Sequence, residues 1–187
     1  MWPTMSTAYP WVAYADVLQK QQDEWIFRQP HIHDGDDVNQ LIADCPPLDI
    51  NSAYCNFLQT SHFNQTCVVA ECNGAIAGFI SAYRKPDAPQ ELFVWQVAVS
   101  PRHRGKGLAF HMLQELLQRD GLQDIAALET TITKTNRGSW RLFEKLDAQH
   151  GKHGQVSTFL CEATHFNGKH DTEYLYRIPL VPSKVNP

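Results

Sequence analysis

The sequence is short of several features that would assign a protein to a broad class. No segment approaches the roughly 20 apolar residues that a helix needs to span a bilayer. Residues 1–10 have neither the basic segment nor the apolar stretch of a secretory signal, and no Cys-x-x-Cys pair occurs among the five cysteines. These absences argue against a membrane span, a disulfide scaffold and a structural zinc site. We expect a cytoplasmic protein with reduced thiols.

Positive charge is also scarce. The chain has 16 Lys and Arg against 20 Asp and Glu, a net charge of −4, whereas nucleic-acid binding depends on clustered basic residues over phosphates. The nine histidines lack ligand spacing, since His31 and His33 would point to opposite faces of a strand. We therefore expect no metal, no nucleic acid and no membrane among the partners.

Basic residues gather in the segment 100–107, Ser-Pro-Arg-His-Arg-Gly-Lys-Gly. It follows the apolar run 92–99, which predicts a buried strand, and precedes residues 108–117, which have apolar side chains at helical spacing. A helix that begins after such a turn presents unpaired N–H groups and a positive dipole end to an anion. Glycines at positions 105 and 107 let a phosphate approach the backbone. The segment therefore predicts a phosphate-binding loop.

Spacing separates the kinds of phosphate loop. The four residues between Gly and Gly-Lys-Ser/Thr that define a Walker A loop are absent, and Phe110 stands where a dinucleotide fingerprint needs its third Gly. The remaining string, Arg-x-x-Gly-x-Gly-Leu-Ala over residues 102–109, resembles the acetyl-CoA loop of the GCN5-related N-acetyltransferases. A basic surface turn is the alternative.

A second segment resembles the same family. Residues 136–145 read Asn-x-x-Ser-x-x-Leu-Phe-Glu-Lys, similar to the family's helix beside the pantetheine arm, although Asn136 alone fits a plain helix cap equally well. The resemblance implies acetyl-CoA as co-substrate, without a metal. The implied cofactor-binding residues are Val97, Val99, Arg102, Arg104, Gly105, Lys106, Gly107, Leu108, Ala109, Asn136, Ser139 and Phe143.

Periodicity predicts elements in the order β–α–α–β–β–β–α–β–α–β–β. This is a mixed α/β (α+β) domain over residues 25–184, after a variable extension, residues 1–24, and it matches the GCN5-related N-acetyltransferase fold, with a central mixed sheet of about seven strands and helices on both faces. Asn73-Gly74 predicts a hairpin turn. We expect a loop over 85–90 and a helix from about residue 51 that turns Tyr54 inward together with Phe57 and Leu58.

Four further segments, residues 44–54, 78–84, 93–99 and 129–133, are similar to the diaminobutyrate acetyltransferases, a family of ectoine biosynthesis within this superfamily. The similarity extends over residues 25–180. It implies acetyl transfer to the 4-amino group of a small diamino acid, L-2,4-diaminobutyrate, by a homodimer. Another small amine as acceptor, and an acetyl-CoA sensor that transfers nothing, remain as alternatives; release of CoA thiol separates the sensor from an enzyme.

Diaminobutyrate carries two ammonium groups and one carboxylate, so its site should offer acidic side chains and some hydrogen-bond donors. The substrate-binding candidates are Asp49, Tyr54, Trp95, His170 and Glu173. Each also has a structural interpretation. Asp49 fits a helix cap, Tyr54 and Trp95 fit a core, and the polar loop 165–173 fits a solvated hairpin.

An ammonium group must lose a proton before it attacks a thioester, and the developing oxyanion needs a donor. The catalytic candidates for the base are Glu173, Glu129 and His170, and the backbone N–H near Val97 is the expected oxyanion donor. Many members of the superfamily have a Tyr that protonates the leaving thiolate, where this chain has Phe143. Tyr54, water or no group at all takes that role.

Overall fold

One seven-stranded sheet organises residues 24–181, the part of the chain that the computed structural model describes. Its order is β1-β2-β3-β4-β5-β7-β6, with every neighbouring pair antiparallel except β4 and β5. The strands are β1 (Ile26–Arg28), β2 (Val68–Cys72), β3 (Ala75–Lys85), β4 (Ala88–Val99), β5 (Ala127–Thr133), β6 (Gln155–Leu160) and β7 (Glu173–Pro179). Apart from Glu24, the expected extension lies outside the described residues.

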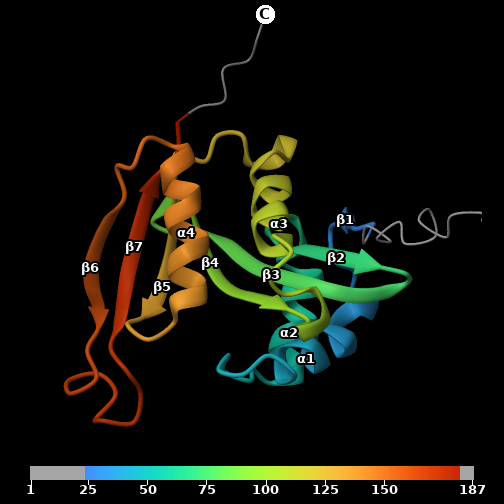
Figure 1. The fold of residues 1–187 in the computed structure, drawn as a ribbon, viewed down its shortest axis with the longest axis horizontal. Helices are drawn as coiled ribbons and strands as arrows, with labels where there is room; N and C mark the ends of the chain where they lie inside the picture. Colours follow the sequence, from blue (N-terminus) through green and yellow to red (C-terminus); the bar gives the residue numbers. More distant parts are fainter. Residues whose placement is uncertain (1–23, 182–187) are drawn as a thin grey trace, which may run out of the picture.

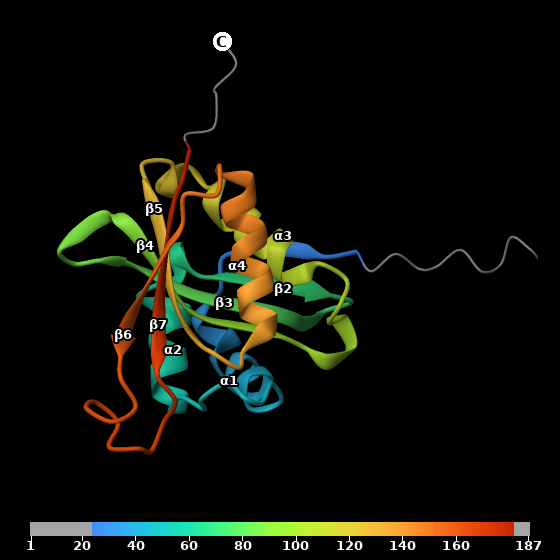
Figure 2. The same cartoon turned by 60° about the vertical axis from the view of Figure 1, so that its left-hand side comes forward.

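Four α-helices of the described residues cover the two faces of the sheet: α1 (Gly35–Ala43), α2 (Ala53–Ser61), α3 (Leu108–Leu117) and α4 (Arg137–Gln149). Helices α3 and α4 lie on one face, and α1, with α2 beside it, lies on the other (Figure 1; Figure 2). Within residues 24–181 no helix combines the length and apolar character that a membrane crossing requires. The predicted element order, strand number and placement of helices on both faces are confirmed.

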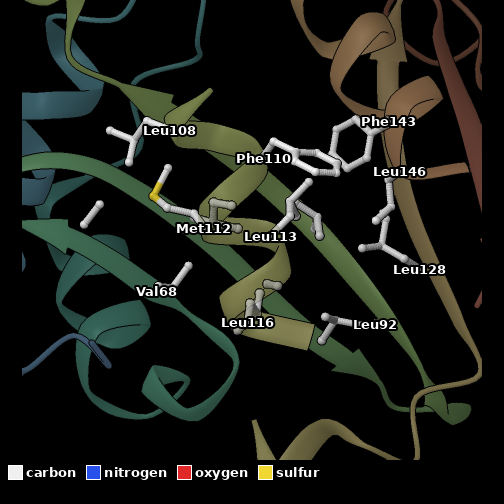
Figure 3. Packing of buried hydrophobic residues seen from close by; sticks show 14 of the residues in the cluster. Val68, Leu92, Leu108, Phe110, Met112, Leu113, Leu116, Leu128, Phe143 and Leu146 are labelled. Carbon is white, nitrogen blue, oxygen red and sulfur yellow. The ribbon is translucent and has the colours of Figure 1, made fainter. Parts of the chain in front are cut away.

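The larger core lies between the sheet and the helices α3 and α4, and a smaller one lies under α1. Figure 3 shows Met112, Leu113 and Leu116 of α3 over the sheet, and Phe110 beside Phe143 of α4. These residues are buried and recur at helical spacing, so burial of apolar area holds α3 on the sheet. The N-terminus of α3 is thereby fixed at the end of β4.

The sequence predicted the hairpin between β2 and β3, but it did not predict the hairpin between β3 and β4. Asn73 and Gly74 both adopt positive φ, 52° and 77°, as the predicted tight turn requires. The loop predicted over 85–90 is wrong, because Lys85 pairs with Ala88 and only Pro86 and Asp87 lie between the strands. The long β3–β4 hairpin is therefore nearly continuous.

The predicted inward face of α2 is also wrong in part. Tyr54 is 73% exposed, whereas Asn56, Gln59 and Thr60 are buried. The cause is a polar contact with α1, in which the Asn56 side-chain amide donates to Asn39 Oδ1 over 2.9 Å. Apolar residues are spread around α2, so their spacing alone did not fix its orientation.

Strands β4 and β5 separate in the middle of the sheet. Their described pairing ends at Val94 and Thr130, although β4 continues to Val99 and β5 to Thr133 (Figure 1). The register against β3 shifts at the same point, with Trp95 as the extra residue of a bulge. As a result Val94 packs in the larger core and Ala98 in the smaller one, although regular alternation would put them on one face.

Candidate active site

Two hollows meet in the gap between β4 and β5. The inner cavity, of about 350 Å³, has walls from both strands and from the β6–β7 loop. The outer groove, of about 560 Å³, runs from the same gap between the N-terminal turns of α3 and α4. The residues that line both are Pro47, Leu48, Val97, Asn136 and Ser139. A ligand in the outer groove can therefore present one end to the inner cavity.

The predicted phosphate loop forms the middle of the outer groove. Gly105 and Gly107 have φ of 74° and 86°, a backbone conformation that glycine adopts at least cost. Gly107 is the residue that precedes α3, and no side chain caps the helix there, so its first N–H groups are available to a ligand. Arg104 Nε donates to the Val99 carbonyl over 3.0 Å and ties the loop to β4. This geometry is an anion site.

Most residues predicted to bind the cofactor line this groove. They are Val97, Val99, Arg104, Gly105, Gly107, Leu108, Ala109, Asn136 and Ser139. Asn136 also caps α4, accepting from the Ser139 backbone N–H over 3.1 Å. Arg102 and Lys106 are exposed residues of the same loop, outside the described lining, and Phe143 lines the inner cavity instead.

The two hollows have opposite charge. The described lining of the outer groove contains Arg104, Arg141 and Lys145 and no acidic side chain. The described lining of the inner cavity contains Asp49, Asp171 and Glu173, together with His170, and no Lys or Arg. In a chain whose net charge is −4, this partition favours an anionic ligand in the groove and a cationic one in the cavity.

His170 holds together the two loops that form the mouth of the inner cavity. Its Nε2 lies 3.5 Å from Asp49 Oδ2, in the α1–α2 connection, and 3.9 Å from Glu173 Oε1. Its Nδ1 lies 2.8 Å from the Asp171 carbonyl, which can only accept, so Nδ1 carries a proton. In a neutral ring the unprotonated Nε2 would then face the two carboxylates of Asp49 and Glu173, which is unfavourable. The hydrogen bond to Asp171 and these charges raise the pKa of His170.

Glu173 is the most enclosed carboxylate of the inner cavity, with 17% of its side chain exposed. Burial raises its pKa, because the charged form loses water. The nearby His170 and a hydrogen bond from Thr131 oppose that shift without reversing it. The cavity thus contains a carboxylate that is a stronger base than an ordinary glutamate.

The positions of Trp95 and Asp49 exclude the structural interpretations that the sequence left open for them. Trp95 is half-exposed and lines the inner cavity, so it is not a core residue. Asp49 does not cap α2, because Ser52 Oγ accepts from the Cys55 N–H over 3.2 Å. The side chain of Asp49 remains 80% exposed at the cavity mouth.

Two predicted catalytic residues lie elsewhere. Tyr54 stands on the exposed side of α2, outside the described linings of the cavity and the groove. Glu129 is 4% exposed on β5, with its Oε2 3.0 Å from Lys85 Nζ and its Oε1 3.8 Å from Arg177 Nε. These ion pairs occupy the Glu129 carboxylate, and it does not line the described inner cavity.

Gln96 lines the inner cavity, and sequence reasoning missed it. It is buried, and its Nε2 donates to the Asp49 carbonyl over 2.8 Å while its Oε1 accepts from Asn51 Nδ2 over 2.7 Å. These bonds fix the loop that contains Asp49 to β4. A signal was present, since Gln96 is the one side-chain amide in the apolar run 92–99. Thr131, which hydrogen-bonds Glu173, has no comparable signal.

A strand gap, a phosphate loop before a helix and an acidic cavity beside them are the parts of an enzyme that moves an acyl group from a phosphorylated carrier to an amine. The model of the acetyltransferase (GNAT) family matches residues 20–148, and the chain belongs to this family.

Within it, the chain belongs with the L-2,4-diaminobutyric acid acetyltransferases. It is 61% identical to the one from Vibrio parahaemolyticus, over 96% of this chain and 99% of the relative, and 59% identical to the one from Vibrio cholerae, over 91% and 98%. The solved structure of diaminobutyrate acetyltransferase EctA from Paenibacillus lautus, in complex with L-2,4-diaminobutyric acid and coenzyme A, superposes with a TM-score of 0.82. The two sequences are 37% identical, and the match covers 88% of this chain and 99% of the EctA chain.

Proposed function

We propose that this protein transfers the acetyl group of acetyl-CoA to the 4-amino group of L-2,4-diaminobutyrate. The observation that carries the proposal is the junction of a basic groove and an acidic cavity in the gap between β4 and β5. The relatives named for this substrate support it, as does the Paenibacillus lautus complex with the diamino acid and coenzyme A.

The outer groove has features that suit the diphosphate, the pantetheine arm and the thioester of acetyl-CoA. Its phosphate loop takes the diphosphate, and the edge of β4 beyond Val94 has no described pairing with β5. Backbone groups on that edge need partners, and the amides of a pantetheine arm supply them. Asn136 and Ser139, which line both hollows, face the arm from α4. The thioester then lies at the junction, next to Val97.

The inner cavity suits a diamino acid. Asp49, in the α1–α2 connection, and Glu173, at the start of β7, both lie near His170, which occupies the position between them. Two carboxylates can take the two ammonium groups of the acceptor, while the half-exposed Trp95 forms an apolar wall for its short carbon chain. The acceptor replaces the contact of His170 with Asp49.

Glu173 is the base of the proposed reaction. The amine must be deprotonated, and a carboxylate whose pKa is raised by burial takes that proton better than an ordinary one. His170 is a poorer base in this position, because its raised pKa keeps it protonated. Once neutral, the amine attacks the thioester carbonyl, and a backbone N–H of β4 near Val97 stabilises the oxyanion.

Departure of the CoA thiolate proceeds without a tyrosine at the end of the cavity. Phe143 is buried, lines the inner cavity and has no proton to give. A thiolate is a good leaving group, with a thiol pKa near that of free cysteine at about 8.5. The attacking nitrogen has one more proton to lose before the amide forms, and water entering along the outer groove can carry that proton to the departing thiolate.

The assembly and setting of the enzyme belong to the same proposal. We take it to act as a homodimer in the cytoplasm, supplying an acetylated precursor of the osmoprotectant ectoine. The edge strand β6 supports a dimer, since Val156 and Phe159 are half-exposed on it and an uncovered edge tends to pair. Light scattering of the purified protein should give twice the chain mass of 21.3 kDa.

The experiment that tests the function measures thiol release from acetyl-CoA with L-2,4-diaminobutyrate, ornithine, lysine and a peptide amine as acceptors. We expect release that is selective for diaminobutyrate, with the product acetylated at the 4-amino group by NMR. Selective thiol release with another amine would support acetyl transfer but contradict diaminobutyrate as the substrate. Tight CoA binding without release from any acceptor would instead identify a sensor.

A further inference from the structure

The outer groove has a second basic region that the phosphate loop does not explain. The loop lies at the N-terminus of α3, whereas Arg141 and Lys145 line the groove from α4, one helical turn apart on the same side. Both residues are exposed, and both also line a neighbouring surface hollow together with Lys152. A single diphosphate at the loop leaves these two cations without a ligand.

Lys145 is held close to the loop. Its Nζ lies 3.8 Å from the centre of the Phe110 ring, and Phe110 belongs to the first turn of α3, three residues after Gly107. Figure 3 shows Phe110 projecting from α3 toward α4 at this point. Three residues of helix span about 4.5 Å, so the ammonium group lies within about 10 Å of the N–H groups that face the diphosphate.

The acidic groups near this region do not neutralise it. Asp147 is buried and accepts hydrogen bonds from Tyr176 Oη and the Gly154 N–H, both over 2.9 Å. Glu144 faces the neighbouring hollow and is not part of the groove lining. The outer end of the groove therefore presents two cations to whatever lies beyond the diphosphate.

We propose that Arg141 and Lys145 bind the ribose 3′-phosphate of coenzyme A, and that this contact makes the enzyme prefer acetyl-CoA over acetyl-dephospho-CoA. The inference rests on the proposed function. In CoA one ribose ring separates the 3′-phosphate from the diphosphate, which matches two basic regions joined by the Phe110 contact. A phosphate monoester is close to a dianion at neutral pH, and Arg and Lys bind it by charge-assisted hydrogen bonds.

The test compares acetyl-CoA with acetyl-dephospho-CoA as donors for the wild-type enzyme and for the double variant Arg141→Gln/Lys145→Gln. We expect the wild-type KM to be about tenfold higher for the dephospho donor, the size of a hydrogen bond to a charged group. The double variant should lose this difference through a higher KM for acetyl-CoA, with an unchanged KM for the dephospho donor. Lys145→Arg should retain most of it.

Two controls make the outcome specific. Lys134→Gln removes an exposed charge that lines a different hollow, and it should behave as wild type with both donors. Gly107→Ala alters the diphosphate loop and should raise both KM values in parallel. A wild type that uses both donors equally, or a double variant that keeps the wild-type ratio, would overturn the inference. If acetyl-CoA supports no turnover at all, the proposed function fails instead, and calorimetry with CoA and dephospho-CoA still tests the 3′-phosphate site.

Discussion

Glu173 and Glu129 are the same kind of side chain in two different environments, the first in the lining of the inner cavity and the second among buried ion pairs. Both are carboxylates on adjacent strands, β7 and β5, and both were candidates for the base. Glu173 lines the inner cavity with a raised pKa, whereas Glu129 is buried in ion pairs with Lys85 and Arg177. Composition and spacing could not separate them, because those cations come from β3 and β7, far away in the sequence.

We predict opposite phenotypes for the two amides. Glu173→Gln should lower kcat by about 10²- to 10⁴-fold, the usual size of general-base catalysis, while acetyl-CoA affinity is retained. Glu129→Gln should retain kcat and lower the free energy of unfolding by about 1–3 kcal/mol, because it weakens a buried charged hydrogen bond. Steady-state kinetics and urea denaturation measure the two effects.

Glu162→Gln is the matched control for Glu173, since Glu162 is an exposed glutamate in the β6–β7 loop that leads into Glu173. It should behave as wild type. A kcat for Glu173→Gln within twofold of wild type would remove Glu173 from the mechanism. Loss of turnover in Glu129→Gln without loss of stability would return Glu129 to the list of catalytic residues.

We predict that His170 makes acceptor binding depend on pH. Its pKa is raised, so the protonated ring persists to higher pH than that of an ordinary histidine, and it adds positive charge among Asp49, Asp171 and Glu173. As pH rises through this pKa the charge is lost, and a cationic acceptor should bind better. The acceptor KM should therefore fall with rising pH. In His170→Gln this dependence of the KM on pH should be weaker. Identical pH profiles for the two proteins would refute the assignment.

At the scale of elements, the bulge in β4 and the start of α3 prepare the site. Trp95 interrupts the alternation of β4, turns Val97 toward the gap and lets Gln96 reach the Asp49 loop. Strand β4 ends at Val99, and six residues later Gly105 begins the left-handed backbone that leads into the N-terminus of α3. The apolar run 92–99 predicted a regular buried strand, and no local signal in that run marks the bulge at Trp95.

Gly107→Ala tests the start of α3. A methyl group there meets only His111 at 3.6 Å, so the cost is not a clash but a left-handed backbone, about 1–2 kcal/mol for a residue with a Cβ. Relief of that strain would turn the first N–H groups away from the diphosphate. We expect acetyl-CoA affinity to fall by about tenfold, the value of one charge-assisted hydrogen bond, as measured by calorimetry.

Gly121→Ala is the control for that substitution. Gly121 has open space around it and no left-handed backbone, so the alanine should be neutral for both stability and binding. Unchanged acetyl-CoA affinity in Gly107→Ala would show that the loop does not hold the diphosphate.

At the scale of the whole molecule, the sequence predicted the order of helices and strands better than it predicted the side-chain contacts between them. The element order, the Asn73-Gly74 hairpin and the strand–loop–helix around Gly105 each arise from residues close together in the chain. The orientation of α2, the ion pair between Glu129 and Lys85, and the Gln96–Asp49 hydrogen bond depend on partners 17, 44 and 47 residues away in the sequence. Sheet register and helix packing decide those partners, and short-range periodicity does not encode them.

The candidate site divides in the same way. The residues predicted to bind the cofactor could be chosen because a phosphate loop is a local motif, and most of them line the outer groove. Asp49 and the β6–β7 loop were found through resemblance, and only the fold brings His170 to within 3.5 Å of Asp49. The two catalytic candidates placed outside the linings, Tyr54 and Glu129, were chosen for their chemistry without knowledge of which face they occupy.

The acidic lining of the inner cavity also bears on what happens after transfer. In the proposed reaction the acceptor enters with two positive charges and leaves with one, since an acetylated nitrogen is neutral. A cavity lined by Asp49, Asp171 and Glu173 therefore holds the product less firmly than the substrate. The contact of His170 with Asp49 can then re-form as the product departs. In the proposed reaction, the carboxylates that attract the diamino acid would therefore also favour release of its acetylated product.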